Sequence, residues 1–219
     1  MFVRLEDIRF SFLHVFQMQQ PRRGDQGKPA YAAQGLFAPN HVTPGGVKVK
    51  DEANQPWRIL LDAAGQPVTS TLVGVRYAID EALRKAGKLD MKAAFGLKDK
   101  LPLHDGEQKA AQYPYYKGML FVSARSGTRP LILDSNKAVL IEKDGKPYSG
   151  CYGTMTFDTF YYPPKNGGEG VSAQLTGVQF LRDGDAFAGG RPADLSDFDD
   201  ISNTGQTPAA GAPKGGLWD

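Results

Sequence analysis

The stretch YSGCYGTMTFDTFYYPP, residues 148–164, decides the fold because apolar residues occupy every second position along most of it. Side chains of a β-strand alternate between its two faces, so Met155, Phe157 and Tyr161 are predicted to face a core. The opposite face would mix polar side chains with rings: Thr154, Thr156, Asp158, Phe160 and Tyr162. Such a face suits the stacking of unpaired bases, because every base offers a π-face. For any single ring, the alternative is that it caps the end of a barrel or supports a loop.

Strand patterns also dominate the rest of the chain. In IRFSFLHVF, residues 8–16, strict alternation would place Ile8, Phe10, Phe12, His14 and Phe16 on one face. Further strands are predicted at residues 29–37, 57–61, 117–124, 129–134 and 171–181. Strands and helices do not alternate, which argues against a doubly wound parallel sheet. The predicted fold class is therefore mainly β, a small antiparallel barrel with one inserted helix.

One amphipathic helix is predicted between these strands. Thr69 or Ser70 is a suitable N-cap, and Gly87 is placed to end the helix. The apolar face is formed by Leu72, Val75, Ile79, Ala82, Leu83 and Ala86.

The charge is divided unevenly along the 219 residues. Residues 183–219 carry seven acids and two basic residues, a net charge of −5, whereas residues 1–182 carry +7. We therefore predict a folded basic domain over 1–182 and an acidic, disordered tail over 183–219. The basic domain would attract polyanions, and the tail could compete with them or recruit a partner protein.

Several functional classes are not supported by the sequence. Cys151 is the only cysteine and there are three histidines, so neither an internal disulfide nor a zinc site is predicted. We expect no catalytic activity and no cofactor, since phosphate-binding loops, serine-hydrolase elbows and zinc-protease motifs are missing. No apolar run is long enough to span a membrane and no secretory signal is present, which predicts a reducing, intracellular compartment.

A second aromatic group, YPYYK at residues 113–117, lies beside basic residues. Arg125 and Arg129 follow in what is predicted to be a hairpin loop. Cations beside rings are what a groove for single strands requires, because phosphates need charge and bases need a flat surface.

The tail carries a short acidic–hydrophobic motif around Leu195, Phe198 and Ile201, and the chain ends in Leu217, Trp218 and Asp219. Segments of this kind dock into apolar pockets with basic rims and become ordered as they bind. The alternative is a tail that only increases solubility.

The order of motifs resembles a family of phage-encoded single-stranded DNA-binding proteins from tailed bacteriophages of enterobacteria. The resemblance covers roughly residues 4–200 and rests on RFSFLHVF, the middle helix, PLHDG, YKGMLFVSA, GCYGTMTFDTFYY and VSAQLTGVQFLRDGDAFAGGR. This sequence departs from the family pattern in the Pro- and Gly-rich segment 39–69 and in the residues that follow the acidic run.

The resemblance implies an OB-fold, a five-stranded Greek-key barrel, with a helix between its third and fourth strands. It also implies non-specific coating of single strands during phage DNA replication and recombination, in the cytoplasm of the infected bacterium and without nucleotide hydrolysis. The acidic C-terminus would contact phage or host replication proteins and screen the DNA groove. The sequence predicts neither membrane binding nor the oligomeric state.

The predicted contacts with DNA are phosphate binding by basic side chains and base stacking by rings: Arg58, Lys117, Arg125, Arg129, Tyr113, Tyr116, Tyr152, Phe160 and Tyr162. The predicted partner-binding residues lie in the tail: Asp194, Asp197, Phe198, Asp199, Asp200 and Trp218. Two alternatives remain open at this point. One is a virion structural or adaptor protein without nucleic-acid activity, and the other is a metal-dependent nuclease that uses Asp51, Glu52 or the acids of 194–200.

Overall fold

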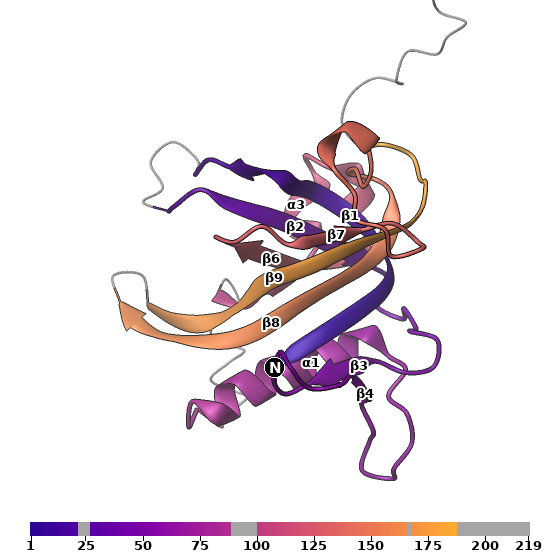
Figure 1. The fold of residues 1–219 in the computed structure, drawn as a ribbon. Helices are drawn as coiled ribbons and strands as arrows, with labels where there is room; N and C mark the ends of the chain where they lie inside the picture. The colour runs from indigo at the N-terminus through magenta and orange to yellow at the C-terminus, as the bar shows by residue number, and fades with distance from the viewer. Residues whose placement is uncertain (22–26, 89–99, 166–167, 188–219) are drawn as a thin grey trace, which may run out of the picture. The chain divides into compact units, whose positions relative to one another are not determined.

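The structure is a computed structural model that describes residues 1–21, 27–88, 100–165 and 168–187. Long strands form its body, and one 15-residue helix and several shorter helical turns lie in the connections between them (Figure 1). The elements are β1 (Phe2–Gln19), β2 (Ala30–Phe37), β3 (Lys48–Lys50), β4 (Arg58–Ile59), α1 (Thr71–Lys85), β5 (Leu103–Asp105), α3 (Glu107–Ala110), η2 (Pro114–Tyr116), β6 (Leu120–Ser126), β7 (Leu131–Leu133), η3 (Glu142–Asp144), β8 (Tyr152–Lys165) and β9 (Gly168–Arg182).

The sheet closes on itself in the order β1–β2–β6–β9–β8–β1. Each pair in this ring is antiparallel except β6 and β9, which run parallel where Arg125 lies opposite Gln174. A closed ring of strands in this order is the five-stranded Greek-key barrel of the OB-fold, so the predicted fold class is confirmed. β3 and β4 extend the sheet outward from β1, while β5 pairs with β6 and β7 pairs with β9.

The two faces of β8 divide as the sequence predicts. Met155 and Phe157 are fully buried in the barrel core, while Thr154, Thr156 and Asp158 are only half-buried on the outer face. Cys151 precedes this strand in the core, and burial raises the pKa of its thiol to about 11. Cys151 is therefore a neutral packing residue.

β1 departs from the alternation that the sequence predicts. Its pairing register shifts between Leu5 and Ile8 on β8 and between Ser11 and His14 on β2, and the residues at these irregularities, Asp7 and Phe12, have φ of +52° and +45°. A β-bulge adds a residue to one strand and so exchanges its two faces. Phe10 is fully buried, whereas Phe12 and His14 are only half-buried. The prediction that all of them share one face is wrong.

The helix α1 forms where the sequence predicts it. Ser70 is the N-cap and accepts a hydrogen bond from the Val73 amide at 3.4 Å, and Gly87 follows the last turn with φ of +71°. Its buried face packs against β8 and β1, where the Thr159 hydroxyl donates a hydrogen bond to the Ala78 carbonyl at 2.9 Å. Figure 1 shows α1 beside β8 and the start of β1.

The position of α1 in the chain order differs from the one that the resemblance implied. The helix connects β2 to β6, the second and third strands of the barrel, and not the third and fourth. The predicted strand at residues 57–61 would have been the third barrel strand before the helix. It forms only the short β4, which pairs with β3 outside the barrel.

Candidate nucleic-acid interface

A groove of about 550 Å³ lies over the outer face of β2 and β6. We call it the β2–β6 groove. Its lining comes from β1, β2, β5, α3 and β6 and from the residues that follow β1: Phe12, Gln19, Gln20, Pro21, Ala32, Gln34, His104, Lys109, Ser123 and Arg125.

The floor of the groove consists of small and polar side chains that alternate with core residues. Ala32 lies opposite Arg125 and Gln34 opposite Ser123 in the antiparallel pairing of β2 with β6. Ala124, between Ser123 and Arg125, is fully buried in the barrel core. Ala32 and Ser123 have short side chains, so a ligand can approach the sheet closely at these two positions.

Phe12 forms one wall of this groove because of the bulge in β1. Its half-buried ring packs edge-on against Tyr113, with 5.0 Å between the ring centroids. Without the exchange of faces on β1, this ring would point into the core beside Phe10.

Two basic side chains line the groove. The ammonium group of Lys109 lies 4.8 Å from the ring centroids of both Phe12 and Phe121 and donates a hydrogen bond to the Gln34 side-chain oxygen at 3.0 Å. Arg125 is exposed on β6. Phe121 is buried, so of these two rings only the half-buried Phe12 can take a base while the cation pairs with phosphate.

Tyr116 supports the groove from below and does not line it. It is fully buried against Leu36 and Phe121, its hydroxyl donates a hydrogen bond to Gln34, and burial raises the pKa of this phenol. Its ring has no free face for a base, so the prediction that Tyr116 stacks on DNA is wrong.

The aromatic surface continues beyond the groove along residues 113–117. The rings of Tyr113 and Tyr115 are 5.9 Å apart, and Tyr115 in turn stacks on Phe187. Lys117 is exposed immediately after η2. Of the predicted contacts, Arg125 lines the groove, Tyr113 packs against the groove residue Phe12, and Lys117 is exposed at the end of this aromatic run.

Tyr152 does not line the β2–β6 groove and lies among arginines, one of which, Arg9, also contacts Phe187. The guanidinium groups of Arg182 and Arg9 lie 3.7 and 5.5 Å from its ring centroid. Its half-buried ring also packs on Gly184. The ring is therefore engaged by the protein itself.

Phe160 and Tyr162 lie toward the tip of the β8–β9 hairpin. Phe160 is 41% exposed and pairs with Ser172 across the hairpin. Tyr162 pairs with Gly170, which has no side chain to separate it from the phenol, and burial raises the pKa of Tyr162. Neither residue lines the β2–β6 groove, although the loop between the fourth and fifth strands of OB-folds commonly contributes to ligand binding.

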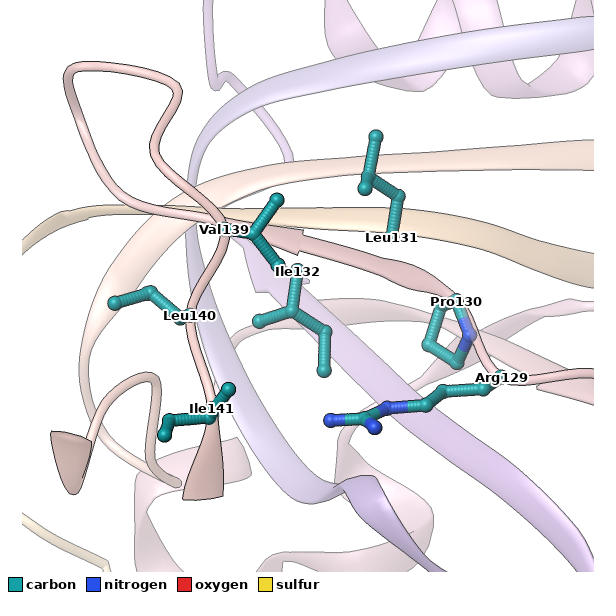
Figure 2. A pocket seen from close by; sticks show the side chains of 7 residues that line it. All are labelled: Arg129, Pro130, Leu131, Ile132, Val139, Leu140 and Ile141. Atoms are coloured by element: carbon teal, nitrogen blue, oxygen red, sulfur yellow. The ribbon is translucent and has the colours of Figure 1, made fainter. Parts of the chain in front are cut away.

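The structure does not bring Arg58 and Arg129 to the groove. Arg58 pairs with Asp51 at 3.3 Å on the short outer strand β4. Arg129 lines a separate cavity of about 360 Å³ together with the exposed apolar side chains of Leu131, Val139 and Ile141 (Figure 2). The predicted partner-binding residues of the tail lie outside the described residues.

Of the ten residues that line the groove, the sequence predicted Arg125 as a DNA contact and missed the other nine, among them Phe12, Gln34, His104 and Lys109. The alternation pattern placed Phe12 on the same face as Phe10, because a bulge leaves no clear mark in the sequence of a strand. His104 belongs to the PLHDG motif that the resemblance singled out, and its ring stacks on Phe121 with 4.9 Å between centroids. That motif was the one available signal for this wall of the groove.

No metal site supports the nuclease alternative in the part of the chain that the structure describes. Within residues 1–21, 27–88, 100–165 and 168–187, no three histidine, cysteine or acidic side chains are grouped so that they could hold a metal ion. Asp51 is paired with Arg58. The acids of 194–200 lie outside these ranges.

Comparisons with known proteins agree with this architecture. The family model described as "Enterobacter phage Enc34, ssDNA-binding protein" matches residues 60–207. "Putative protein p50" of Acyrthosiphon pisum secondary endosymbiont phage 1 is 42% identical over 133 residues, which cover 59% of this chain and 68% of that protein.

Two solved structures show the same fold. The single-stranded DNA-binding protein of bacteriophage Enc34 in complex with ssDNA aligns with a TM-score of 0.60 at 19% identity, over 85% of this chain and 89% of that one. A further structure of the Enc34 protein aligns with a TM-score of 0.58 at 21% identity, over 90% and 88% of the two chains. The family model spans more than half of the 219 residues, and this chain therefore belongs to the family of the Enterobacter phage Enc34 ssDNA-binding protein.

Proposed function

We propose that this protein binds single-stranded DNA in the β2–β6 groove without sequence preference. The proposal rests on one observation: an aromatic ring, that of Phe12, and two cations, those of Lys109 and Arg125, line the same groove on the barrel. Family membership supports the same ligand, since the Enc34 protein is solved in complex with ssDNA.

Binding would combine two physical contributions. Stacking of a base on a protein ring contributes about 1–3 kcal/mol and does not depend on which base is present. Phosphate pairing with cations contributes through the release of counterions and weakens as salt rises. Neither contribution reads base edges, which explains why binding would not depend on sequence.

The proposed role is to protect and organise single strands during phage DNA replication and recombination, in the cytoplasm of the infected bacterium. This role needs binding alone and no chemical step. Among the described helices, none is long and apolar enough to cross a membrane.

The proposal predicts strong salt dependence and a preference for unpaired strands. The logarithm of the binding constant falls linearly with the logarithm of the salt concentration, with a slope of ~0.7 for each phosphate contact to a single strand. If about four phosphates are neutralised, affinity therefore falls about fifty-fold between 50 and 200 mM salt. Duplexes should bind more weakly because their bases are already stacked. Gel shifts of matched single- and double-stranded oligonucleotides at two salt concentrations measure both effects, and salt-independent affinity would reject the proposal.

Arg125→Ala should lower the salt slope by ~0.7, the contribution of one phosphate contact. Arg58→Ala is the matched control, because Arg58 is also an exposed arginine on a strand but pairs with Asp51 outside the groove. Its slope should equal that of the unmodified protein. Equal losses in both variants would place the phosphate contacts elsewhere.

We also propose that the acidic tail competes with DNA and recruits a partner protein. The sequence predicts the tail over 183–219, but the structure describes its first five residues, which are held by hydrogen bonds to Tyr148 and Ser149, so the segment proposed to compete is 188–219. It carries five acids and two basic residues, a net charge of −3. Deleting this segment should tighten binding to single strands, most at low salt, because an internal polyanion is lost. A second variant changes Asp194, Asp197, Asp199 and Asp200 to asparagine and should reproduce much of the gain; unchanged or weaker binding in both variants would refute self-competition.

A further inference from the structure

Residues 183–187 form a strap that follows β9 and places the ring of Phe187 in a flat slot. One face of the ring stacks on Tyr115, with centroids 3.6 Å apart and an interplanar angle of 3°. The guanidinium carbon of Arg9 lies 4.2 Å from the Phe187 centroid. Phe187 therefore contacts both a parallel ring and a cation.

The strap is held to the barrel by polar contacts around the SGCYG motif. The Phe187 amide donates to the Ser149 carbonyl at 3.0 Å, and Arg9 donates to the Asp185 carbonyl at 3.0 Å. The Tyr148 hydroxyl donates to the Gly184 carbonyl at 2.9 Å. Gly150 has φ of +113°, and a β-carbon there would lie 2.1 Å from the Asp185 oxygen, so only glycine lets the strap approach.

The slot has the geometry of a base-binding site. Proteins bind unpaired bases by stacking them on aromatic rings and on arginine guanidinium planes. The rings of Phe12, Tyr113 and Tyr115 also form a continuous path from the β2–β6 groove to the slot, with spacings of 5.0 and 5.9 Å between successive centroids. A strand bound in the groove could continue along this path to the slot.

We propose that the slot between Tyr115 and Arg9 is an additional nucleobase subsite, which Phe187 fills in the free protein and a base of the bound strand fills in the complex. This inference rests on the proposed function. A base would recover the stacking on Tyr115 that Phe187 loses, and its phosphate would bring a negative charge near Arg9. The exchange costs the strap contacts, so Phe187 acts as a built-in competitor.

Phe187→Ala tests this directly, because it empties the slot. We expect affinity for oligothymidylate to rise by about fivefold or more, which corresponds to the lower end of the free energy that one base–ring stacking contact contributes. The site size should also grow by about one nucleotide. The gain should disappear in the double variant Phe187→Ala/Tyr115→Ala, which removes the stacking surface for the incoming base.

Tyr148→Phe tests the same subsite if Phe187→Ala folds poorly. It removes the hydroxyl that contacts Asp183 and Gly184 and leaves both the slot and Phe187 in place. Because the strap is then easier to displace, affinity should rise, though less than in Phe187→Ala.

Phe187→Trp, made in a Trp57→Phe/Trp218→Phe background so that it carries the only tryptophan, reports on displacement itself. On addition of saturating oligothymidylate, the tryptophan should leave the slot and its emission should shift to longer wavelength. If the parent protein fails to bind oligothymidylate, the proposed function fails. If it binds, but Phe187→Ala leaves affinity and site size unchanged and the tryptophan emission does not shift, the ring is a structural anchor and the subsite is refuted.

Discussion

Replacing Phe12 with alanine should lower the affinity for single-stranded DNA about 5- to 150-fold, the loss that corresponds to ~1–3 kcal/mol of stacking. The ring lines the groove beside Lys109 and Tyr113 and is only half-buried. Its removal takes away the aromatic wall of the proposed site, and Phe12 is not part of the barrel core. Fluorescence anisotropy with a labelled oligothymidylate measures the loss.

Phe2→Ala is the matched control for this prediction. Phe2 is also a half-buried phenylalanine on β1, but it lies at the other end of the strand, where Lys50 covers its ring at 5.0 Å. Its removal should change affinity little. If Phe2→Ala and Phe12→Ala weaken binding equally, or if neither does, the assignment of Phe12 to the groove wall is wrong.

Phe10→Ala should affect stability, where Phe12→Ala affects DNA affinity. It should lower the free energy of unfolding by about 3–5 kcal/mol, the usual loss for a phenylalanine removed from a core. Phe10 is fully buried and packs against Gly153, where a β-carbon would lie 2.5 Å from its ring. Removal of the ring leaves a cavity that this tightly paired region of β1, β8 and β9 can fill only in part. Urea unfolding followed by circular dichroism measures the change.

The same unfolding experiment on Phe12→Ala supplies the comparison. Because Phe12 lies outside the barrel core, its loss should destabilise the fold clearly less than the loss of Phe10. Equal destabilisation by the two changes would mean that the bulge does not separate them, and the groove would then lose its aromatic wall.

The barrel could be predicted from the sequence because apolar and polar residues alternate along its strands. Met155 and Phe157 alternate with polar residues, and this period fixes which face of β8 is buried. Ser70 and Gly87 marked the ends of α1 because caps and left-handed C-terminal residues have strong side-chain preferences.

The site was harder to predict because it depends on irregular backbone and on contacts between distant segments. The bulge at Phe12 arises from pairing with β2 and has no local sequence signature. Tyr116 and Tyr113 are neighbours in one aromatic run, yet the η2 turn buries the first and leaves the second half-buried. Arg58 and Arg125 look alike in sequence, and only the strand order places one of them in the groove.

Ultraviolet crosslinking of the full chain to oligothymidylate, followed by identification of the modified peptides, shows where on the barrel single-stranded DNA binds. We expect crosslinks in the peptide that contains Phe12 and in peptides from residues 104–125, which contribute His104, Lys109 and Arg125 to the groove. Crosslinks confined to α1 or to β3 and β4, with none on the β2–β6 face, would contradict binding in this groove.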